Sequence, residues 1–171
     1  SSATAEDLPG ASFAGQQASF LNVKGEANLI EKVKEAWASL FTARAIFYRV
    51  TNKFDHFKVS IAVPVQKMVN SEISGVMFTV DPIAYDKTKI VIEAVLGLGE
   101  MIVQGAVTPD HYEVDKGKLR LITKEVHVQE KQKIKKGRDN AIVALSKTVG
   151  GKQKLSDDLI VEVAKIGKAL E

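Results

Sequence analysis

The chain has 171 residues, of which 45% are hydrophobic and 26% are charged, and its formal net charge is +3. This composition is ordinary for a soluble globular domain with a sizeable core, and the small charge fits an anionic ligand without indicating nucleic acid. The absence of cysteine excludes disulfides and fits a cytoplasmic protein, and no apolar run is long enough to suggest a membrane helix.

The first seventeen residues, SSATAEDLPGASFAGQQ, are polar, small and rich in turn formers. Gly10 and Gly15 permit backbone conformations that other residues avoid, and Pro9 favours an extended or turn dipeptide. Backbone N–H groups in such a segment can approach an anion closely, as they do in phosphate-binding loops. The composition therefore allows either a phosphate loop or a frayed N-terminal tail.

The next element is predicted to be one long helix that runs from Asn28 to about Tyr48. Asn28 and Glu31 form a capping-box-like pair, and an apolar stripe follows at helical spacing. The stripe indicates a face that packs against the core. Two arginines of this region, Arg44 and Arg49, are interpreted either as solvated or structural charges or as phosphate contacts.

From Lys58 onward the hydrophobic period changes from that of a helix to that of strands. Strand patterns occupy Val59–Val65, Gly75–Val80, Ile90–Val95, Tyr112–Val114 and Leu119–Ile122. Pro64 places the first at an edge or a bulge, whereas the continuous apolar run of the third is typical of a strand covered on both faces. We predict that Val59–Val69 pairs with Val76–Val80, and that the last two strands form a hairpin with Gly117 at its turn.

The segment Lys124–Arg138 is rich in charge and has no aromatic side chain. A nucleic-acid-binding patch would combine clustered cations with stacking aromatics, so this segment is interpreted as a solvated connection. The final helix is predicted to begin after its N-cap, Ser156, and to bury a stripe that runs from Leu159 to Leu170.

Together these elements predict an α+β fold in which a mixed or antiparallel sheet is flanked by the Leu29–Tyr48 and Leu159–Leu170 helices. Four consecutive segments of one nucleotide-binding domain are expected: a phosphate-loop segment over residues 1–24, a helical segment over 25–57, a sheet over 58–128, and a connection with the C-terminal helix over 129–171.

Six stretches carry a resemblance to a known family. They are the opening SSATAEDLPGASFAGQQ with FLNV, then SLFTARAIFYR, VPVQKMV, SGVMFTVDP, GLGEMIVQG and TPDHY, in this order. The chain resembles the N-terminal ATP-binding part of phosphoenolpyruvate synthase and, more broadly, the group of pyruvate phosphate dikinase and rifampin phosphotransferase. The resemblance implies an ATP-grasp-like subdomain whose opening segment closes over the ATP phosphates.

The resemblance also implies which residues hold ATP and Mg²⁺. The phosphate cradle would consist of Gly15, Gln16, Gln17 and Ser19, although the family usually has Asp-Thr where this chain has Ala18-Ser19. The adenine slot would consist of Gln66, Lys67, Met68 and Val69; the alternative is that Met68 is ordinary core filler. Mg²⁺ prefers carboxylates and phosphate oxygens, which makes Glu93 the candidate metal ligand. Glu100 could orient the neighbouring glycine turn, and both glutamates could also be plain surface charges.

The implied function is the ATP-binding part of an enzyme that converts ATP, pyruvate and water to phosphoenolpyruvate, AMP and phosphate through a phosphohistidine. Its partners would be the phosphohistidine domain and the substrate barrel of the parent enzyme. None of His56, His111 and His127 lies in the Thr-x-His setting of the carrier domain, so no catalytic residue is predicted in this chain. The alternatives are a rifampin-type phosphotransferase and a stand-alone nucleotide-binding regulatory module.

In the family an arginine precedes the Ser-Ser pair, and an acidic strand with Gln-x-Arg-Pro follows the helix that here closes the chain. We therefore expect the chain to be a piece of a longer protein. We also expect its dissociation constant for ATP to be about millimolar or too weak to detect. The missing arginine and the missing acidic strand with Gln-x-Arg-Pro would remove charge-assisted contacts to phosphate, each worth about 1.5–3 kcal/mol.

Overall fold

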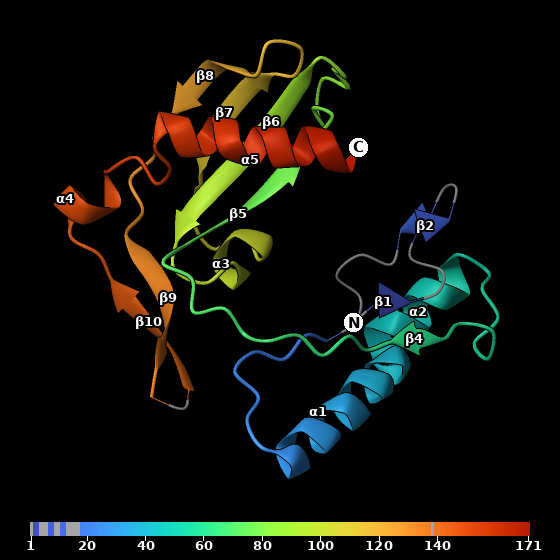
Figure 1. The fold of residues 1–171 in the computed structure, drawn as a ribbon. Coiled ribbons are helices and arrows are strands. Elements are labelled where there is room, and N and C mark those ends of the chain that lie inside the picture. The colour runs from blue at the N-terminus through green and yellow to red at the C-terminus, as the bar shows by residue number, and fades with distance from the viewer. Residues whose placement is uncertain (1, 4–6, 9–10, 13–17, 138) are drawn as a thin grey trace. The chain divides into compact units, whose positions relative to one another are not determined.

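A computed structural model describes residues 2–3, 7–8, 11–12, 18–137 and 139–171, with the backbone alone described before residue 18. The chain divides into two compact units, Ser1–Met68 (unit 1) and Val69–Glu171 (unit 2). Most of their helices and strands are labelled in Figure 1. Among the described residues, none of the helices combines the length and the hydropathy that a membrane-spanning segment requires.

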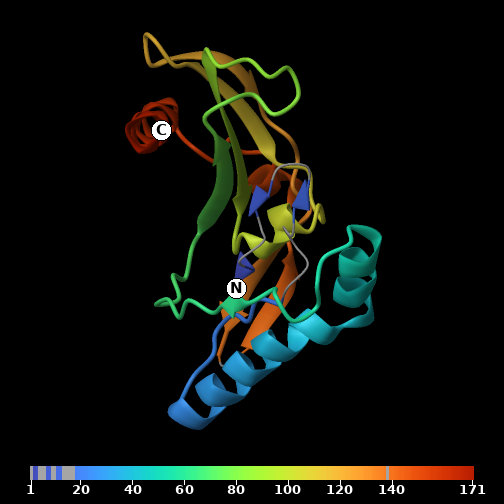
Figure 2. The same cartoon turned by 90° about the vertical axis from the view of Figure 1, so that its right-hand side faces the viewer.

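The helical part of unit 1 is broken in the middle, so the prediction of one continuous helix is wrong. Its elements are α1 (Glu26–Ala38), the 3₁₀ helix η1 (Ser39–Phe41) and α2 (Ala43–Thr51). The change of direction between α1 and α2 is visible in Figure 2. Thr42 marks the break, because its ψ of 152° is extended and its Oγ1 accepts a hydrogen bond from the N–H of Ala45 at 3.3 Å. α1 also begins directly after Gly25, whose φ is +81°, and not at the predicted cap Asn28.

Two short antiparallel strand pairs complete unit 1. They are β1 (Ser2–Ala3) with β4 (Ile61–Ala62), and β2 (Asp7–Leu8) with β3 (Ala11–Ser12). The predicted pairing of Val59–Val69 with Val76–Val80 is therefore wrong. β4 has only two residues, and Pro64, which lacks the N–H that a ladder needs, follows shortly after its end.

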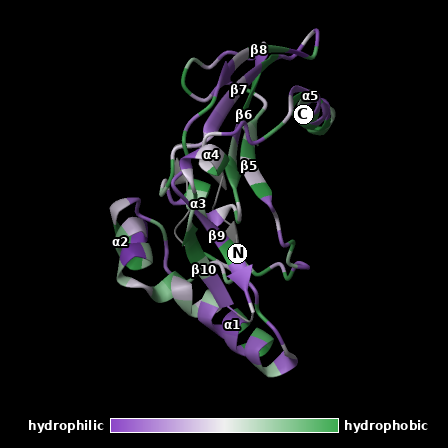
Figure 3. Cartoon of the chain, turned by 90° about the vertical axis from the view of Figure 1, so that its left-hand side faces the viewer, coloured by the Kyte–Doolittle hydropathy of each residue, from purple (hydrophilic) through white to green (hydrophobic). Residues whose placement is uncertain are grey.

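A small apolar cluster holds the end of the helical part against the chain near β4. Leu40 and Val59 are buried at its centre, and Tyr48, Phe54 and Ile61 pack against them. Hydrophilic and hydrophobic residues both lie along α1 (Figure 3), as expected for a helix with one solvated face.

Unit 2 is built on a four-stranded antiparallel sheet in the order β5-β6-β7-β8. The strands are β5 (Ile73–Phe78), β6 (Lys89–Leu96), β7 (Asp110–Asp115) and β8 (Arg120–Glu125). The helix α5 (Asp157–Leu170) crosses one face of this sheet (Figure 1), and its N-cap is Ser156, as predicted. Helices combined with an antiparallel sheet confirm the predicted α+β class, and the hairpin of β7 and β8 is confirmed as well.

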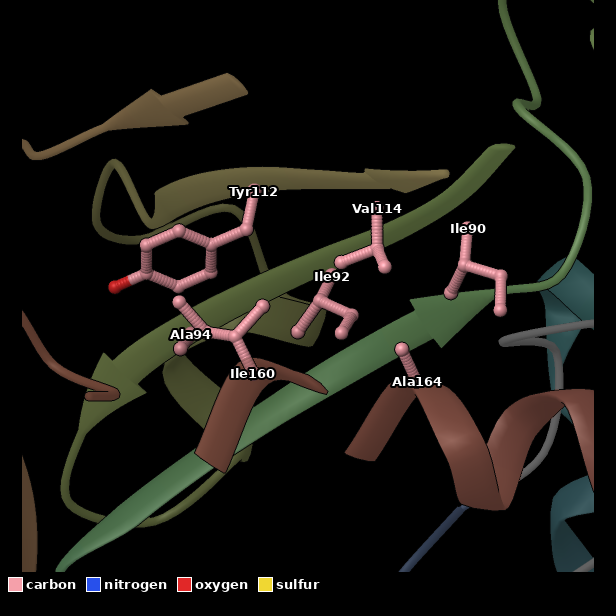
Figure 4. Packing of buried hydrophobic residues seen from close by; sticks show 7 residues of the cluster. All are labelled: Ile90, Ile92, Ala94, Tyr112, Val114, Ile160 and Ala164. Atoms are coloured by element: carbon pink, nitrogen blue, oxygen red, sulfur yellow. The ribbon is translucent and has the colours of Figure 1, made fainter. Parts of the chain in front are cut away.

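The core of unit 2 lies between α5 and the sheet. Alternating side chains of β6 and β7 point toward two side chains of α5 (Figure 4); the cluster comprises Ile90, Ile92, Ala94, Tyr112, Val114, Ile160 and Ala164. Val91 and Val95, which alternate with these residues along β6, are buried too. The prediction that β6 is covered on both faces is thus confirmed at Val91 and Val95, whereas Glu93, on the same face, is partly exposed.

The charge-rich segment Lys124–Arg138, interpreted from the sequence as a connection, contains part of a second hairpin. Its strands are β9 (Lys131–Lys136) and β10 (Asp139–Ala144). The buried side chain of Gln129 ties the start of β9 to the sheet, because it accepts from the N–H of Leu96 at 2.8 Å and donates to the C=O of Leu96 at 3.0 Å. Two single-turn helices complete unit 2: α3 (Glu100–Val103) and α4 (Lys147–Gly150).

Candidate functional site

The predicted site residues fall in three parts of the chain. Gly15, Gln16 and Gln17 lie outside the described residues. Unit 1 contains Ser19, Gln66, Lys67 and Met68, whereas unit 2 contains Val69 and Glu93. Each group is therefore considered within its own unit.

Within unit 1, a backbone ladder joins the start of the opening segment to the strand that precedes the predicted adenine slot. Ser2 pairs with Ala62 and Ala3 pairs with Ile61, 60 and 58 positions apart in the sequence. Gln66 follows the end of β4 after three intervening residues. The two stretches that the sequence assigns to phosphate and adenine thus start from neighbouring strands.

The residues that directly follow the opening seventeen are fixed to the helices of unit 1 by two contacts. The N–H of Ala18 donates to Ser39 Oγ at 3.2 Å, and Lys32 Nζ lies 5.2 Å from the centroid of the Phe20 ring. Ser19, between these two anchored residues, has an exposed side chain. Its hydroxyl can therefore donate to an external ligand while the backbone on either side is held.

The predicted adenine slot is an exposed stretch without regular secondary structure. All four of its residues are exposed, Met68 at 37% and Val69 at 72%. Within the described part of the chain, the backbone N–H and C=O groups of residues 66–69 form no hydrogen bond. Such groups can pair with the polar edge of a planar ring, and the exposed Met68 side chain can cover its apolar face.

Glu93 lies in the middle of β6, opposite His111 of β7. Glu93 Oε1 is 3.8 Å from His111 Nδ1, and Glu113 Oε1 is 3.9 Å from the other ring nitrogen, Nε2. A hydrogen bond from Lys89 Nζ, 3.0 Å long, lowers the pKa of Glu113 against the opposing effect of burial. Over the residues that the structure describes, no group of three or more His, Cys, Asp or Glu side chains could hold a metal ion. Among the described residues, Glu93 thus has no protein partners for a metal site, and oxygen ligands from another molecule, such as phosphate, would complete one.

Glu100, the second acidic candidate, is engaged by two side chains. Lys133 Nζ contacts Glu100 Oε2, and Gln104 Nε2 donates to Glu100 Oε1 at 2.9 Å. The same strand holds the preceding glycine turn, because the N–H of Leu98 donates to the C=O of Lys133 at 2.8 Å. These contacts favour the role in which Glu100 orients the turn. The sequence reasoning missed Lys133, whose position depends on the unrecognised β9–β10 hairpin.

Arg49 is buried, with 1% of its surface exposed, so it is not a solvated helix charge. Its Nε donates to His56 Nδ1 at 3.0 Å, and its guanidinium lies 5.7 Å from the centroid of the Phe41 ring. Among the described residues, Arg49 Nη2 is buried without a hydrogen-bond partner. Because Nδ1 accepts from a guanidinium, the proton of the neutral His56 ring is on Nε2.

Replacing His56 by alanine should lower the free energy of unfolding of unit 1 by about 1.5–3 kcal/mol, because a buried guanidinium loses its acceptor. Trp37, the only tryptophan of the chain, lies in α1, so denaturation followed by tryptophan fluorescence reports on unit 1. Asn52→Ala is the matched control, since its exposed side chain donates to the C=O of Tyr48 at 2.9 Å and should cost less than about 1 kcal/mol. Equal losses for the two variants would contradict the role given to His56.

Comparison of the sequence with known proteins identifies one family and several similar enzymes. The sequence profile of the family described as pyruvate phosphate dikinase, AMP/ATP-binding domain, matches residues 1–171. The chain is 51% identical over 178 residues to the phosphoenolpyruvate synthase of Pyrococcus furiosus, a match that covers 100% of the chain and 22% of that protein. It is 51% identical over 173 residues to the probable phosphoenolpyruvate synthase of Methanocaldococcus jannaschii, covering 100% of the chain and 14% of that protein.

The phosphoenolpyruvate synthase of Aeropyrum pernix is 57% identical over 133 residues, which is 78% of the chain and 16% of that protein. The chain thus spans between 14% and 22% of the length of these relatives. The profile match covers every residue of the chain and agrees with the resemblance of its six sequence stretches. The protein belongs to the pyruvate phosphate dikinase family, in which it corresponds to the AMP/ATP-binding domain.

Proposed function

We propose that the chain binds ATP, as a domain of the ATP-grasp type, on behalf of a phosphoenolpyruvate synthase. The observation that carries the proposal is the family match over all 171 residues, together with the names of the relatives described above. The complete reaction would convert ATP, pyruvate and water to phosphoenolpyruvate, AMP and phosphate through a phosphohistidine. The names of the relatives favour this reaction over a rifampin-type phosphotransferase and over a stand-alone regulatory module.

In this proposal the opening segment binds the phosphates and residues 66–69 bind the adenine. Gly15, Gln16, Gln17 and Ser19 form the cradle, and Gln66, Lys67, Met68 and Val69 form the slot. Three observations support the assignment: the exposed side chain of Ser19, the backbone of residues 66–69, which has no hydrogen-bond partner among the described residues, and the pairing of β1 with β4. N–H and C=O groups that no described residue pairs suit the alternating donors and acceptors along the adenine edge.

We assign Mg²⁺ to Glu93 together with the phosphate oxygens of ATP. The donor set fits, because Mg²⁺ in nucleotide sites is commonly bound by one or two carboxylates and the phosphates themselves. When bound, the cation neutralises phosphate charge. The part of this chain is to hold the Glu93 carboxylate, which β6 fixes on the sheet and His111 contacts at 3.8 Å.

The share of this chain in phosphoryl transfer would be positioning and charge neutralisation, which is most of what this reaction requires of a protein. We propose that the phosphohistidine domain and the substrate barrel of the longer enzyme are its partners, and that neither nucleic acid nor a membrane is. The cysteine-free composition fits a cytoplasmic enzyme. The four sequence segments defined at the start would together form one partial nucleotide-binding domain.

Replacing Met68 by serine should weaken the binding of Mg·ATP about threefold to tenfold, because the adenine face loses apolar cover. Titration followed by amide NMR shifts measures dissociation constants into the millimolar range. Val65→Ser is the matched control, since Val65 is 62% exposed and lies just before the slot. An unchanged affinity in Met68→Ser, or the same loss in both variants, would show that the slot is placed wrongly.

A further inference from the structure

Ser39 carries a buried hydroxyl that ties two distant parts of unit 1 together. Its side chain is 6% exposed, and its Oγ donates to the C=O of Ala36 at 2.6 Å and accepts from the N–H of Ala18 at 3.2 Å. A serine hydroxyl has one proton and two lone pairs, so the bond to Ala36 uses the proton and leaves a lone pair for Ala18. The hydroxyl therefore links the C-terminal end of α1 to a residue 21 positions earlier in the chain.

A second contact holds the other side of Ser19. Lys32 Nζ lies over the ring of Phe20 at 5.2 Å, and the same ammonium group is fixed by Glu35 Oε1 at 2.6 Å. Ser19 thus lies between two residues that are anchored to α1 and η1, while its own side chain is exposed. A backbone that is fixed on both sides determines where the Ser19 side chain emerges, so its hydroxyl is a positioned hydrogen-bond donor.

We propose that Ser39 is a positioning residue for ATP, which acts by holding Ala18 so that the hydroxyl of Ser19 is oriented toward a phosphate oxygen. This inference rests on the proposed function. Ser39 itself does not contact the ligand. Its effect on affinity arises because a donor that is already ordered loses little conformational freedom when the ligand binds. A purely structural Ser39, which only closes the end of α1, would affect stability and leave the phosphate contact unchanged.

The test is the Ser39→Ala variant of the 171-residue chain, titrated separately with Mg·ATP and with adenosine. We expect the dissociation constant for Mg·ATP to rise about threefold to tenfold, while that for adenosine stays unchanged because adenosine has no phosphate. Thr42→Ala is the matched control. Thr42 lies in the same helical break, but its hydroxyl bonds to the C=O of Ser39 at 3.1 Å and to the N–H of Ala45. Thr42→Ala should lower the melting temperature and leave the affinity for both ligands unchanged.

Lys32→Met keeps the test decisive even if Ser39→Ala does not fold, because Lys32 is partly exposed and anchors the other side of Ser19. It should raise the dissociation constant for Mg·ATP about twofold to fivefold, again without an effect on adenosine. Wild-type affinity for Mg·ATP in both variants, or equal losses for Mg·ATP and adenosine, would overturn the positioning role of Ser39. Neither result would contradict the proposal that the chain binds ATP. A wild-type chain that does not respond to Mg·ATP at all would overturn the proposed function, and the inference with it.

Discussion

Replacing Lys154 by methionine should lower the free energy of unfolding of unit 2 by about 3–5 kcal/mol. The side chains of Lys154 and Asp110 are both fully buried, and Lys154 Nζ lies 2.8 Å from Asp110 Oδ1. Lys154 Nζ also donates to the C=O of Gly150 at 2.9 Å and to the C=O of His127. The substitution therefore leaves a buried carboxylate without its counter-ion and two carbonyl groups without a donor. Amide hydrogen exchange in β6 and β7 measures the loss.

An exposed ion pair of the same unit provides the control. Lys124 Nζ lies 2.8 Å from Asp157 Oδ1, but these two side chains are 36% and 57% exposed. Lys124→Met should cost at most about 1 kcal/mol, because water screens the charges and replaces the lost contact. If the two lysine variants were equally destabilised, burial of the Lys154–Asp110 pair would not be the source of its effect.

The same variant should also change the acid stability of unit 2. Burial by itself raises the pKa of Asp110, but hydrogen bonds from Lys154, the backbone N–H groups of His127 and Lys154, and the Tyr112 hydroxyl outweigh it and lower the pKa. Asp110 therefore contributes stability that is present above its unfolded-state pKa of about 4 and is lost as the pH falls through the lower folded-state value. Without the Lys154 ammonium group the folded-state pKa rises, so the acid unfolding midpoint should move to higher pH.

Replacing Gly150 by alanine should destabilise unit 2 by about 3 kcal/mol. An added Cβ would lie 1.9 Å from the carbonyl oxygen of Gln129 and 2.9 Å from its carbonyl carbon. These are backbone atoms, and the N–H of Gln129 donates to the C=O of Gly150 at 3.1 Å, so the two segments cannot separate without losing that bond. The melting temperature of the amide signals of unit 2 measures the effect.

Gly105→Ala is the control for Gly150→Ala, because it introduces backbone strain without steric overlap. Gly105 has a φ of +63°, but no atom lies within 4 Å of an added Cβ. The substitution should cost only about 1–2 kcal/mol, which is the penalty for a side chain in the left-handed region. A Gly105→Ala variant as unstable as Gly150→Ala would mean that the contact with Gln129 is not what requires a glycine.

The sequence predicted the elements whose burial leaves a clear hydrophobic pattern. It did not predict the elements that depend on side-chain hydrogen bonds or on long-range pairing. β6 was predictable from its continuous apolar run, and α5 because its apolar residues repeat with the period of a helix. The break between α1 and α2 is hidden from that reasoning, because the apolar stripe continues through Leu40 and Phe41. Its signal is the pair of hydroxyl residues Ser39 and Thr42, which hydrogen-bond to the backbone at helix ends.

The β9–β10 hairpin was missed by the sequence-based prediction for a different reason. Lysines occupy four of the six positions of β9, and Ile134 is its only apolar residue, so hydrophobic alternation cannot reveal it. The hairpin exists because its backbone pairs over six residues and because Gln129 and Lys133 tie it to β6 and to the glycine turn. Such long-range contacts have no local pattern, and the pairing of β1 with β4 is undetectable in the sequence for the same reason.

A motif also cannot distinguish a ligand contact from a structural one. The stretch TPDHY contributes to the family resemblance, but Asp110 and Tyr112 face the interior, where the Tyr112 hydroxyl donates to Asp110 Oδ2 at 2.7 Å. Burial, with the added effect of this bond, raises the pKa of Tyr112 well above its usual value. Ser19 is a different case: the resemblance implies that it contacts phosphate, and the structure adds that its side chain is exposed while its neighbours Ala18 and Phe20 are held.

Amide NMR shifts with three ligands test the central claim most directly. Mg·ATP should move the signals of Ser19 and of residues 66–69 together. Adenosine should move only those of residues 66–69, and magnesium tripolyphosphate should move only Ser19 and its neighbours, because each carries half of the groups that ATP presents. Shifts at both places with ATP and at one place with each partial ligand would support a nucleotide site built from these two stretches. Millimolar Mg·ATP that leaves both places unchanged, or adenosine that moves Ser19 alone, would contradict it.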